Sequence, residues 1–259
     1  MKPFLLLLLV GLTTQCHPPK DHWQPLLINN TLEGWHIFQD DGIKKGWIVE
    51  DQVLTFNGLS DMESGEGDAS LLSDQVYHNF EIQFEWKVEP GGNSGFMWGV
   101  SEDKKYKYPY QTGPEIQILD AAIYDNPTSV LGGEIEVNNV LMDLEDRKHF
   151  VGALYDLSAP IATAVSKAAE QWNNYHIKIN YDTNLGEVIF NDVLVNSFPL
   201  NGPNWEALLQ ESKFSKSEDF PYLGDARWYD FGKFSSGHIC FQDHPGKASF
   251  RNIRIKILD

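Results

Sequence analysis

Acidic and amide side chains gather on two apolar segments in the first half of the chain. Residues 91–98 read Gly-Gly-Asn-Ser-Gly-Phe-Met-Trp, and residues 115–120 read Glu-Ile-Gln-Ile-Leu-Asp. Alternate side chains of a strand share a face, so Glu115 and Gln117 lie together, opposite the isoleucines. A carboxylate beside a carboxamide, near the glycine-framed Asn93, is typical of a cleft that binds a polar ligand such as a sugar. The alternative interpretation is a solvated strand face and a plain hairpin turn.

A second polar group, Gln242-Asp243-His244, follows the apolar segment 237–241. Histidine can take and return protons near neutral pH, and the adjacent Asp243 can orient it. A lone histidine in a turn is more often simply exposed. These three residues are therefore candidates for proton transfer and ligand binding.

Two further residues have a structural alternative. Trp98 can offer an aromatic face to a sugar ring, although a tryptophan in a strand more often belongs to the core. His176 is predicted to project from the polar face of a strand over residues 175–181, and a structural role is favoured there.

Several specific motifs are absent from the sequence. There is no His-Glu-x-x-His, no cysteine pair, no EF-hand spacing and no Gly-x-Ser-x-Gly elbow. The glycines at residues 91–95 lack the Lys-Ser/Thr ending of a phosphate loop. No cofactor is identified, and the alternative of a divalent ion bound by carboxylates remains.

The acidic charge balance of the chain argues against two classes of binding partner. The chain has 37 acidic and 20 basic residues and a formal net charge of −17. This argues against a nucleic-acid partner and against binding to anionic lipid through surface charge.

Residues 1–15 are predicted to be a signal peptide, because the apolar run over residues 4–12 is too short to span a bilayer and typical of a secretory signal. Cys16 at its end predicts a bacterial lipoprotein, with residues 16–30 as a tether from the lipid; ordinary secretion is the alternative. We expect an exported protein, lipid-anchored in the periplasm or at the outer membrane or cell surface. The other cysteine, Cys240, is then left without a disulfide partner.

Residues 31–259 are predicted to form a single all-β domain. Apolar and polar residues alternate over residues 80–88, as in a half-buried antiparallel strand. Many short strands without a βαβ rhythm indicate a sandwich or a barrel. The other predicted strands span residues 46–49, 53–56, 69–72, 94–100, 115–119, 175–181, 187–190, 193–198, 237–241 and 250–257.

Three segments depart from this strand pattern. Residues 203–210 predict a short helix, with proline at its first position. Residues 160–172 predict a loop or one short helix. The long polar loop over residues 121–150 is expected to wall a binding cleft.

Together these motifs resemble the secreted 3-keto-disaccharide hydrolase domain family, which is abundant in Bacteroidetes lipoproteins. The order and spacing of the pieces make the resemblance specific. It rests on Gly34-Trp35, Trp47, Phe80-Glu81, Asn93-Ser94-Gly95, Glu115 to Asp120, Gly152-Ala153-Leu154-Tyr155, Trp172-Asn173, Gly237-His238-Ile239, Gln242-Asp243-His244 and Phe250 to Ile255.

The resemblance implies a concanavalin A-like jelly roll of two antiparallel sheets and a substrate glycoside oxidised to a ketone at C3. A C3 ketone acidifies the C2 proton, so a base can remove it, the enolate can expel the C1 oxygen, and water can add afterwards. The proton-transfer candidates are Glu115, His244 and Asp120. The candidates for substrate binding are Asn93, Gln117, Trp98, Gln242, Asp243, Tyr155 and His176.

The sequence also departs from the family. Many members carry an arginine on the strand after Asn-Ser-Gly, where this chain has Met97-Trp98, and another where it has His176. The main alternative is a non-catalytic carbohydrate-binding protein, because the same jelly roll serves lectins. A laminarinase-type glycosidase ranks lower, because Glu115 is paired with an amide instead of a second carboxylate.

Overall fold

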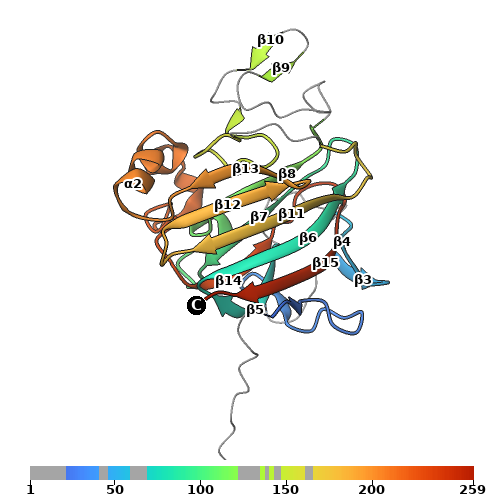
Figure 1. Cartoon of the computed structure of the whole chain (residues 1–259). Helices are drawn as coiled ribbons and strands as arrows, with labels where there is room; N and C mark the ends of the chain where they lie inside the picture. Colours follow the sequence, from blue (N-terminus) through green and yellow to red (C-terminus); the bar gives the residue numbers. More distant parts are fainter. Residues whose placement is uncertain are drawn as a thin grey trace, which may run out of the picture.

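Two antiparallel sheets pack face to face in the computed structural model, which describes residues 22–40, 46–58, 69–121, 135–137, 140–142, 147–160 and 166–259. The eight-stranded sheet has the order β13-β12-β11-β6-β15-β4-β3 (Figure 1), and β1 pairs with β15. Its strands are β1 (Gln24–Pro25), β3 (Trp47–Glu50), β4 (Val53–Phe56), β6 (Phe80–Val88), β11 (Asn173–Asn180), β12 (Leu185–Phe190), β13 (Val193–Phe198) and β15 (Ala248–Ile257).

The second sheet has five strands in the order β2-β5-β14-β7-β8. These are β2 (Trp35–Ile37), β5 (Leu71–Tyr77), β7 (Asn93–Val100), β8 (Glu115–Leu119) and β14 (Gly237–Phe241). A separate hairpin pairs β9 (Ile135–Val137) with β10 (Val140–Met142). Two antiparallel sheets with these many short strands confirm the predicted jelly-roll sandwich.

Strand alternation builds the core between the sheets. On β6 the apolar residues at alternate positions are buried and the polar residues between them are half-buried, as predicted. Phe84 of β6 reaches across to the five-stranded sheet, with ring centroids 5.6 Å from Phe96 and 5.3 Å from Phe241. Aromatic packing of this kind joins the two layers.

The outer face of the five-stranded sheet is also buried along part of its length. Met97 and Cys240 alternate with the inward Phe96 and Phe241, and they pack with Tyr106 in a second, smaller cluster. Tyr106 comes from the segment that joins β7 to β8. This segment therefore covers one part of the sheet's outer face, and polar residues stand on another part.

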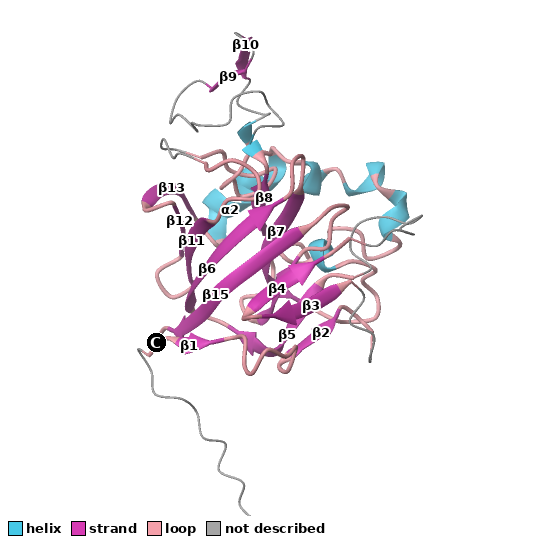
Figure 2. Cartoon of the chain, turned by 90° about the vertical axis from the view of Figure 1, so that its right-hand side faces the viewer, coloured by secondary structure: helices cyan, strands magenta, loops and turns pink. Residues whose placement is uncertain are grey.

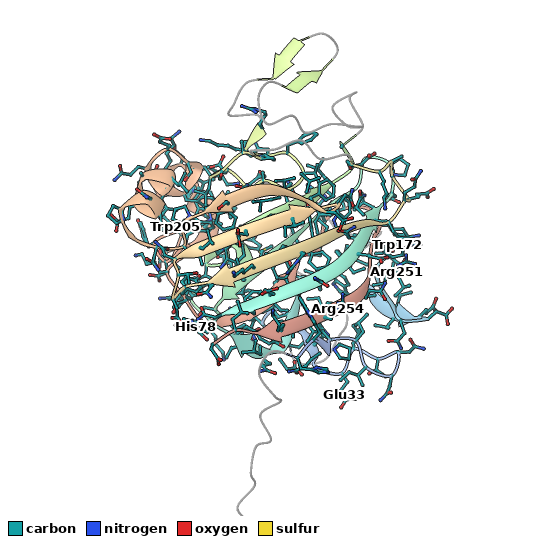
Figure 3. All side chains as sticks on the ribbon, in the orientation of Figure 1. Glu33, His78, Trp172, Trp205, Arg251 and Arg254 are labelled. Carbon is teal, nitrogen blue, oxygen red and sulfur yellow. The ribbon has the colours of Figure 1, made fainter. Side chains whose placement is uncertain are left out.

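Most of the helical segments in the described residues follow β13, and one 3-10 turn lies between β7 and β8. The helix α2 (Gly202–Gln210) confirms the prediction for residues 203–210. Its Trp205, labelled in Figure 3, lies parallel to Phe231 with ring centroids 6.5 Å apart. The short 3-10 turns are η1 (Pro109–Gln111), η3 (Lys213–Ser215), η4 (Ser217–Asp219) and η5 (Pro221–Leu223). Figure 2 shows the helical segments gathered at one end of the sandwich, near β8.

Some sequence expectations differ from the structure. The strand expected over residues 69–72 runs instead from Leu71 to Tyr77, and β2 was not expected at all. Residues 166–172 form turns and irregular backbone. The signal segment, Cys16, and most of the loop over residues 121–150 lie outside the described residues. Within the described ranges, no helix is both long and apolar enough to cross a membrane.

Candidate active site

A cleft of about 150 Å³ opens on the outer face of the five-stranded sheet. Its floor comes from β7, β8 and the residues after β14, and its walls come from η1 and the segment after α2. The lining residues are Asn93, Tyr110, Gly113, Glu115, Gln117, Tyr155, Lys213, Phe214, Tyr222, Trp228, Phe231, Gln242 and His244.

Glu115 is the carboxylate on the floor of this cleft. Its Cα is paired with Met97 of β7, and its side chain leans over Gly95, with 8% of the residue exposed. A Cβ on Gly95 would stand 1.9 Å from Glu115 Oε1, so only glycine leaves room for this carboxylate. Its near-complete burial is the setting in which a carboxylate can serve as a base.

Buried polar atoms without a protein partner concentrate in the cleft. Five such side-chain atoms occur among the described residues, and three of them line it: Asn93 Oδ1, Gln242 Oε1 and Trp228 Nε1. A buried polar group without a hydrogen bond costs about 1–3 kcal/mol. Two acceptors and one donor on residues that line one cleft are suited to the hydroxyl and carbonyl groups of a sugar.

The wall after α2 carries a cation and aromatic rings. Lys213 Nζ lies 4.3 Å from the centroid of the Tyr155 ring and 5.7 Å from that of Trp228. Phe214 packs against Phe231 with centroids 3.6 Å apart. This wall therefore combines a positive charge with apolar ring faces.

Asp156 fixes the position of this wall. Its Oδ2 accepts a hydrogen bond from the Lys213 backbone N–H at 2.6 Å, and its Oδ1 lies 2.8 Å from His149 Nε2. Burial alone raises the pKa of Asp156, but the hydrogen bonds from His149 and Lys213 outweigh it and hold that pKa below its usual value. Asp156 is thus an ionised anchor for η3.

Comparison with known families fits this geometry. Residues 22–256 match the model of the 3-keto-alpha-glucoside-1,2-lyase-like domain. The chain belongs to this family. A curated relative from Bacteroides thetaiotaomicron, named 3-keto-disaccharide hydrolase, is 31% identical over 249 residues, covering 92% of this chain and 79% of the relative.

Two crystal structures from Parabacteroides distasonis, each named as a candidate glycosyl hydrolase, are similar to the chain. The first is 29% identical, with a TM-score of 0.71 and coverage of 92% of this chain and 94% of that one. The second is 21% identical, with a TM-score of 0.57 and coverage of 92% and 100%, and it supports the fold alone.

In this member of the family, six residues singled out from the sequence line the same cleft. They come from four separate parts of the chain: β7, β8, the residues before Asp156, and the residues after β14. These six are Asn93, Glu115, Gln117, Tyr155, Gln242 and His244.

The two remaining acidic candidates hold turns in place. Asp120 Oδ2 accepts the Gly91 backbone N–H at 3.0 Å, which closes the turn before β7. Asp243 is fully buried and accepts hydrogen bonds from Ser70 Oγ and Ala69 N. Neither residue is among those that line the cleft, and the hydrogen bonds described for both are structural. Their expected roles toward substrate stay predictions.

Trp98 and His176 also lie elsewhere. Trp98 is 1% exposed, stacks on Phe198 inside the sandwich and donates its indole N–H to Tyr181 Oη at 3.2 Å. His176 stands on the outer face of the eight-stranded sheet, 2.8 Å from Glu81 Oε2. The burial of Trp98 between the sheets contradicts its expected contact with substrate. His176 lies outside the cleft, and its favoured structural role stays a prediction.

The eight-stranded sheet carries a wider hollow of about 720 Å³ around His176. Several of its polar groups bind one another: Arg254 donates to Gln83 Oε1 at 2.9 and 2.6 Å, and Asn252 donates to Glu85 Oε1 at 3.1 Å. Glu85 also pairs with Arg251, which faces Trp172 (Figure 3). The smaller cleft, which holds the unpaired buried atoms, is the better candidate for the active site.

Sequence reasoning missed the residues of the 3-10 turns and of the turn that follows η5. Lys213, Tyr110, Tyr222 and Trp228 sit on irregular backbone, where neither strand nor helix periodicity applies. The available signal was compositional, since residues 205–231 are rich in aromatic side chains.

Proposed function

We propose that the protein is a carbohydrate-active enzyme that cleaves glycosides oxidised to a ketone at C3, with its reaction in the cleft over β7 and β8. The observation that carries the proposal is the buried carboxylate of Glu115 in a cleft with three unpaired buried polar atoms. Membership of the 3-keto-alpha-glucoside-1,2-lyase-like family and the relative named 3-keto-disaccharide hydrolase support the substrate class.

The chemistry needs a base, an acid for the leaving oxygen, and groups that stabilise the enolate. A base removes the proton at C2, the electrons form a C1–C2 double bond through the enolate, and the C1–O bond breaks as the leaving oxygen gains a proton. Water then adds across the new double bond to give the free 3-keto sugar. Each positioned proton-transfer group contributes about 10²–10⁴-fold to the rate.

The cleft contains candidates for each role. Glu115 is assigned as the base at C2, and His244 as the acid for the leaving oxygen. Lys213 and the indole N–H of Trp228 are assigned to the enolate oxygen, because a cation and a buried donor stabilise developing negative charge. Asn93, Gln117 and Gln242 bind the sugar hydroxyls, and Tyr155 packs against the ring.

A conventional retaining glycosidase fits less well. That mechanism needs two carboxylates about 5–5.5 Å apart. In the described part of the chain, the lining of the cleft includes a single carboxylate, Glu115. The remaining alternative is carbohydrate binding without turnover, which the same hydrogen-bonding groups would allow.

The deciding experiment follows 3-keto-trehalose, 3-keto-cellobiose and their unoxidised parents by NMR in D₂O. We expect turnover of the keto sugars only, with deuterium entering at C2. Glu115→Gln should lower the rate by about 10²–10⁴-fold. The matched control is Glu33→Gln, because Glu33 is exposed on a distant loop (Figure 3). Binding without exchange at C2 would instead indicate a carbohydrate-binding protein.

Export through lipidated Cys16 also stays a proposal. It rests on the apolar segment before Cys16 and on the polar tether after it. Mass spectrometry of the mature N-terminus tests it: a diacylglyceryl group on Cys16 supports the anchor, and an unmodified cysteine or another N-terminus rejects it.

A further inference from the structure

Three side chains capable of binding a metal converge on the outer face of the five-stranded sheet, outside the candidate cleft. They are His36 of β2, His238 of β14 and Glu102, which follows β7. One ligand atom from each lies within 4.8 Å of the other two. Glu102 Oε2 is 2.8 Å from His36 Nε2 and 3.7 Å from His238 Nε2.

A second layer of hydrogen bonds orients all three groups. His36 Nδ1 lies 2.7 Å from Asp74 Oδ1, and His238 Nδ1 lies 2.6 Å from the carbonyl oxygen of Ser73. Because a carbonyl only accepts, His238 carries its proton on Nδ1 and can direct the lone pair of Nε2 toward Glu102. Glu102 is held in turn, since its Oε1 accepts the backbone N–H of Gln39 at 2.9 Å. Histidine ligands of metals are usually fixed in this way.

We propose that His36, His238 and Glu102 form a binding site for a divalent transition-metal ion of the Zn²⁺ type. Two imidazole nitrogens and one carboxylate oxygen favour such an ion over Ca²⁺ or Mg²⁺. Tetrahedral Zn²⁺ with ligands at about 2.0–2.1 Å holds neighbouring ligand atoms roughly 3.3 Å apart. The separations of 2.8 and 3.7 Å lie on either side of this value. The ligand atoms of the two histidines lie within 4.8 Å of each other, so the imidazole rings must also turn toward one another to complete the site.

The site is distinct from the candidate active site. His238 precedes Gln242 by four residues on and after β14, which corresponds to roughly 13 Å along an extended chain. The three ligands are partly exposed, with 18–26% of each side chain accessible, so an ion can enter.

The ion would link three separate segments. His36 and His238 belong to strands on either side of β5, and Glu102 begins the segment that leads to Tyr110 and Gly113 of the cleft. Binding to the folded state alone raises stability. The metal therefore stabilises the β7–β8 connection at its first residues.

An ion-pair network is the competing explanation. A protonated His36 between Asp74 and Glu102 would account for the contacts of 2.7 and 2.8 Å without any metal. Such a network predicts no metal affinity, so direct binding measurements separate the two.

The test uses chelator-treated protein without a polyhistidine tag. Calorimetry with Zn²⁺ should give one site, Co²⁺ should produce visible absorption bands, and Zn²⁺ should raise the unfolding temperature. His36→Ala, His238→Ala and Glu102→Gln should each abolish the three signals. Asp74→Asn, which changes an exposed side chain, should weaken the affinity roughly tenfold to a hundredfold. The control is His22→Gln, because His22 is exposed and outside the cluster.

Two results would overturn the proposal. The absence of heat, absorption bands and thermal stabilisation would leave an ion-pair network only. Unchanged metal affinity in folded variants of His36, His238 or Glu102 would place the ion elsewhere. If those variants do not fold, unchanged affinity in Asp74→Asn would lead to the same conclusion. Because binding is measured without substrate, these outcomes are independent of the proposed reaction.

Discussion

The carboxylate of Glu115 on β8 occupies the space in which a side chain at Gly95 on β7 would lie. A Cβ on Gly95 would lie 1.9 Å from Glu115 Oε1, 2.5 Å from Cδ and 2.7 Å from Cγ. Backbone strain does not limit the exchange, because Gly95 is absent from the positions with positive φ. Gly95→Ala should therefore displace the carboxylate and lower turnover of a 3-keto-glycoside by about 10²–10⁴-fold, as for loss of a proton-transfer group.

A double-mutant cycle separates this effect from general damage to the sheet. In a Glu115→Ala background, Gly95→Ala should cause little further loss of activity, because the carboxylate is already gone. Circular dichroism should show a folded protein in all three variants. Full activity of Gly95→Ala would show that the position of Glu115 is not critical.

The unpaired amide oxygen of Gln242 predicts opposite effects on stability and function. Gln242 is 6% exposed and its Oε1 has no protein partner, so Gln242→Met should leave the free energy of unfolding unchanged or raise it. Loss of its bond to substrate should cost about 1–3 kcal/mol, or roughly 5–150-fold in kcat/KM.

A buried amide with satisfied hydrogen bonds provides the control. Asn196 donates to the carbonyl oxygens of Gly152 and Ser158 and accepts from Ser158 Oγ. Asn196→Leu should therefore lower the free energy of unfolding by about 1–3 kcal/mol. If Gln242→Met were destabilised to the same degree with unchanged kcat/KM, the amide would be structural.

The sequence predicted the floor of the cleft better than its walls. Glu115 and Gln117 share a face because strand alternation fixes it, and the family resemblance brought Gln242 and His244 to the same place. Alternation alone could not show that Trp98 points between the sheets, since Met97 on the other face is apolar too. Lys213 was missed because a single 3-10 turn is too short to show a periodic pattern of apolar residues in the sequence.

Trp98 should matter for stability and not for substrate binding. Its indole N–H bonds to Tyr181 Oη, and burial raises the pKa of that tyrosine to about 12. Trp98→Phe removes the bond and leaves a cavity, so the free energy of unfolding should fall by about 1–4 kcal/mol. The KM for the keto sugar should not change, and a large rise in KM at unchanged stability would contradict this assignment.

The depressed pKa of Asp156 predicts how its contribution to the free energy of unfolding depends on pH. The folded state favours the ionised form, so the stabilisation is fully present above the usual pKa near 4 and is lost as pH falls through the lower folded value. Asp156→Asn should lower the free energy of unfolding by about 1.5–3 kcal/mol at neutral pH. The difference between variant and wild type should shrink in acid, and a difference that persists below the folded pKa would show that charge is not its origin.

Cys240 should be inert in the folded protein. Burial, together with the nearby carboxylate of Asp243, raises the pKa of its thiol well above the usual value, and its side chain is enclosed in the smaller cluster beside Met97. Because the thiolate is the reactive form, alkylation should require unfolding. In a Cys16→Ser chain, where Cys240 is the single thiol, iodoacetamide should react at least about a thousandfold more slowly with native than with denatured protein. Rapid labelling of the native protein would contradict this. It would mean that the segment between β7 and β8 opens readily and exposes Cys240 on β14.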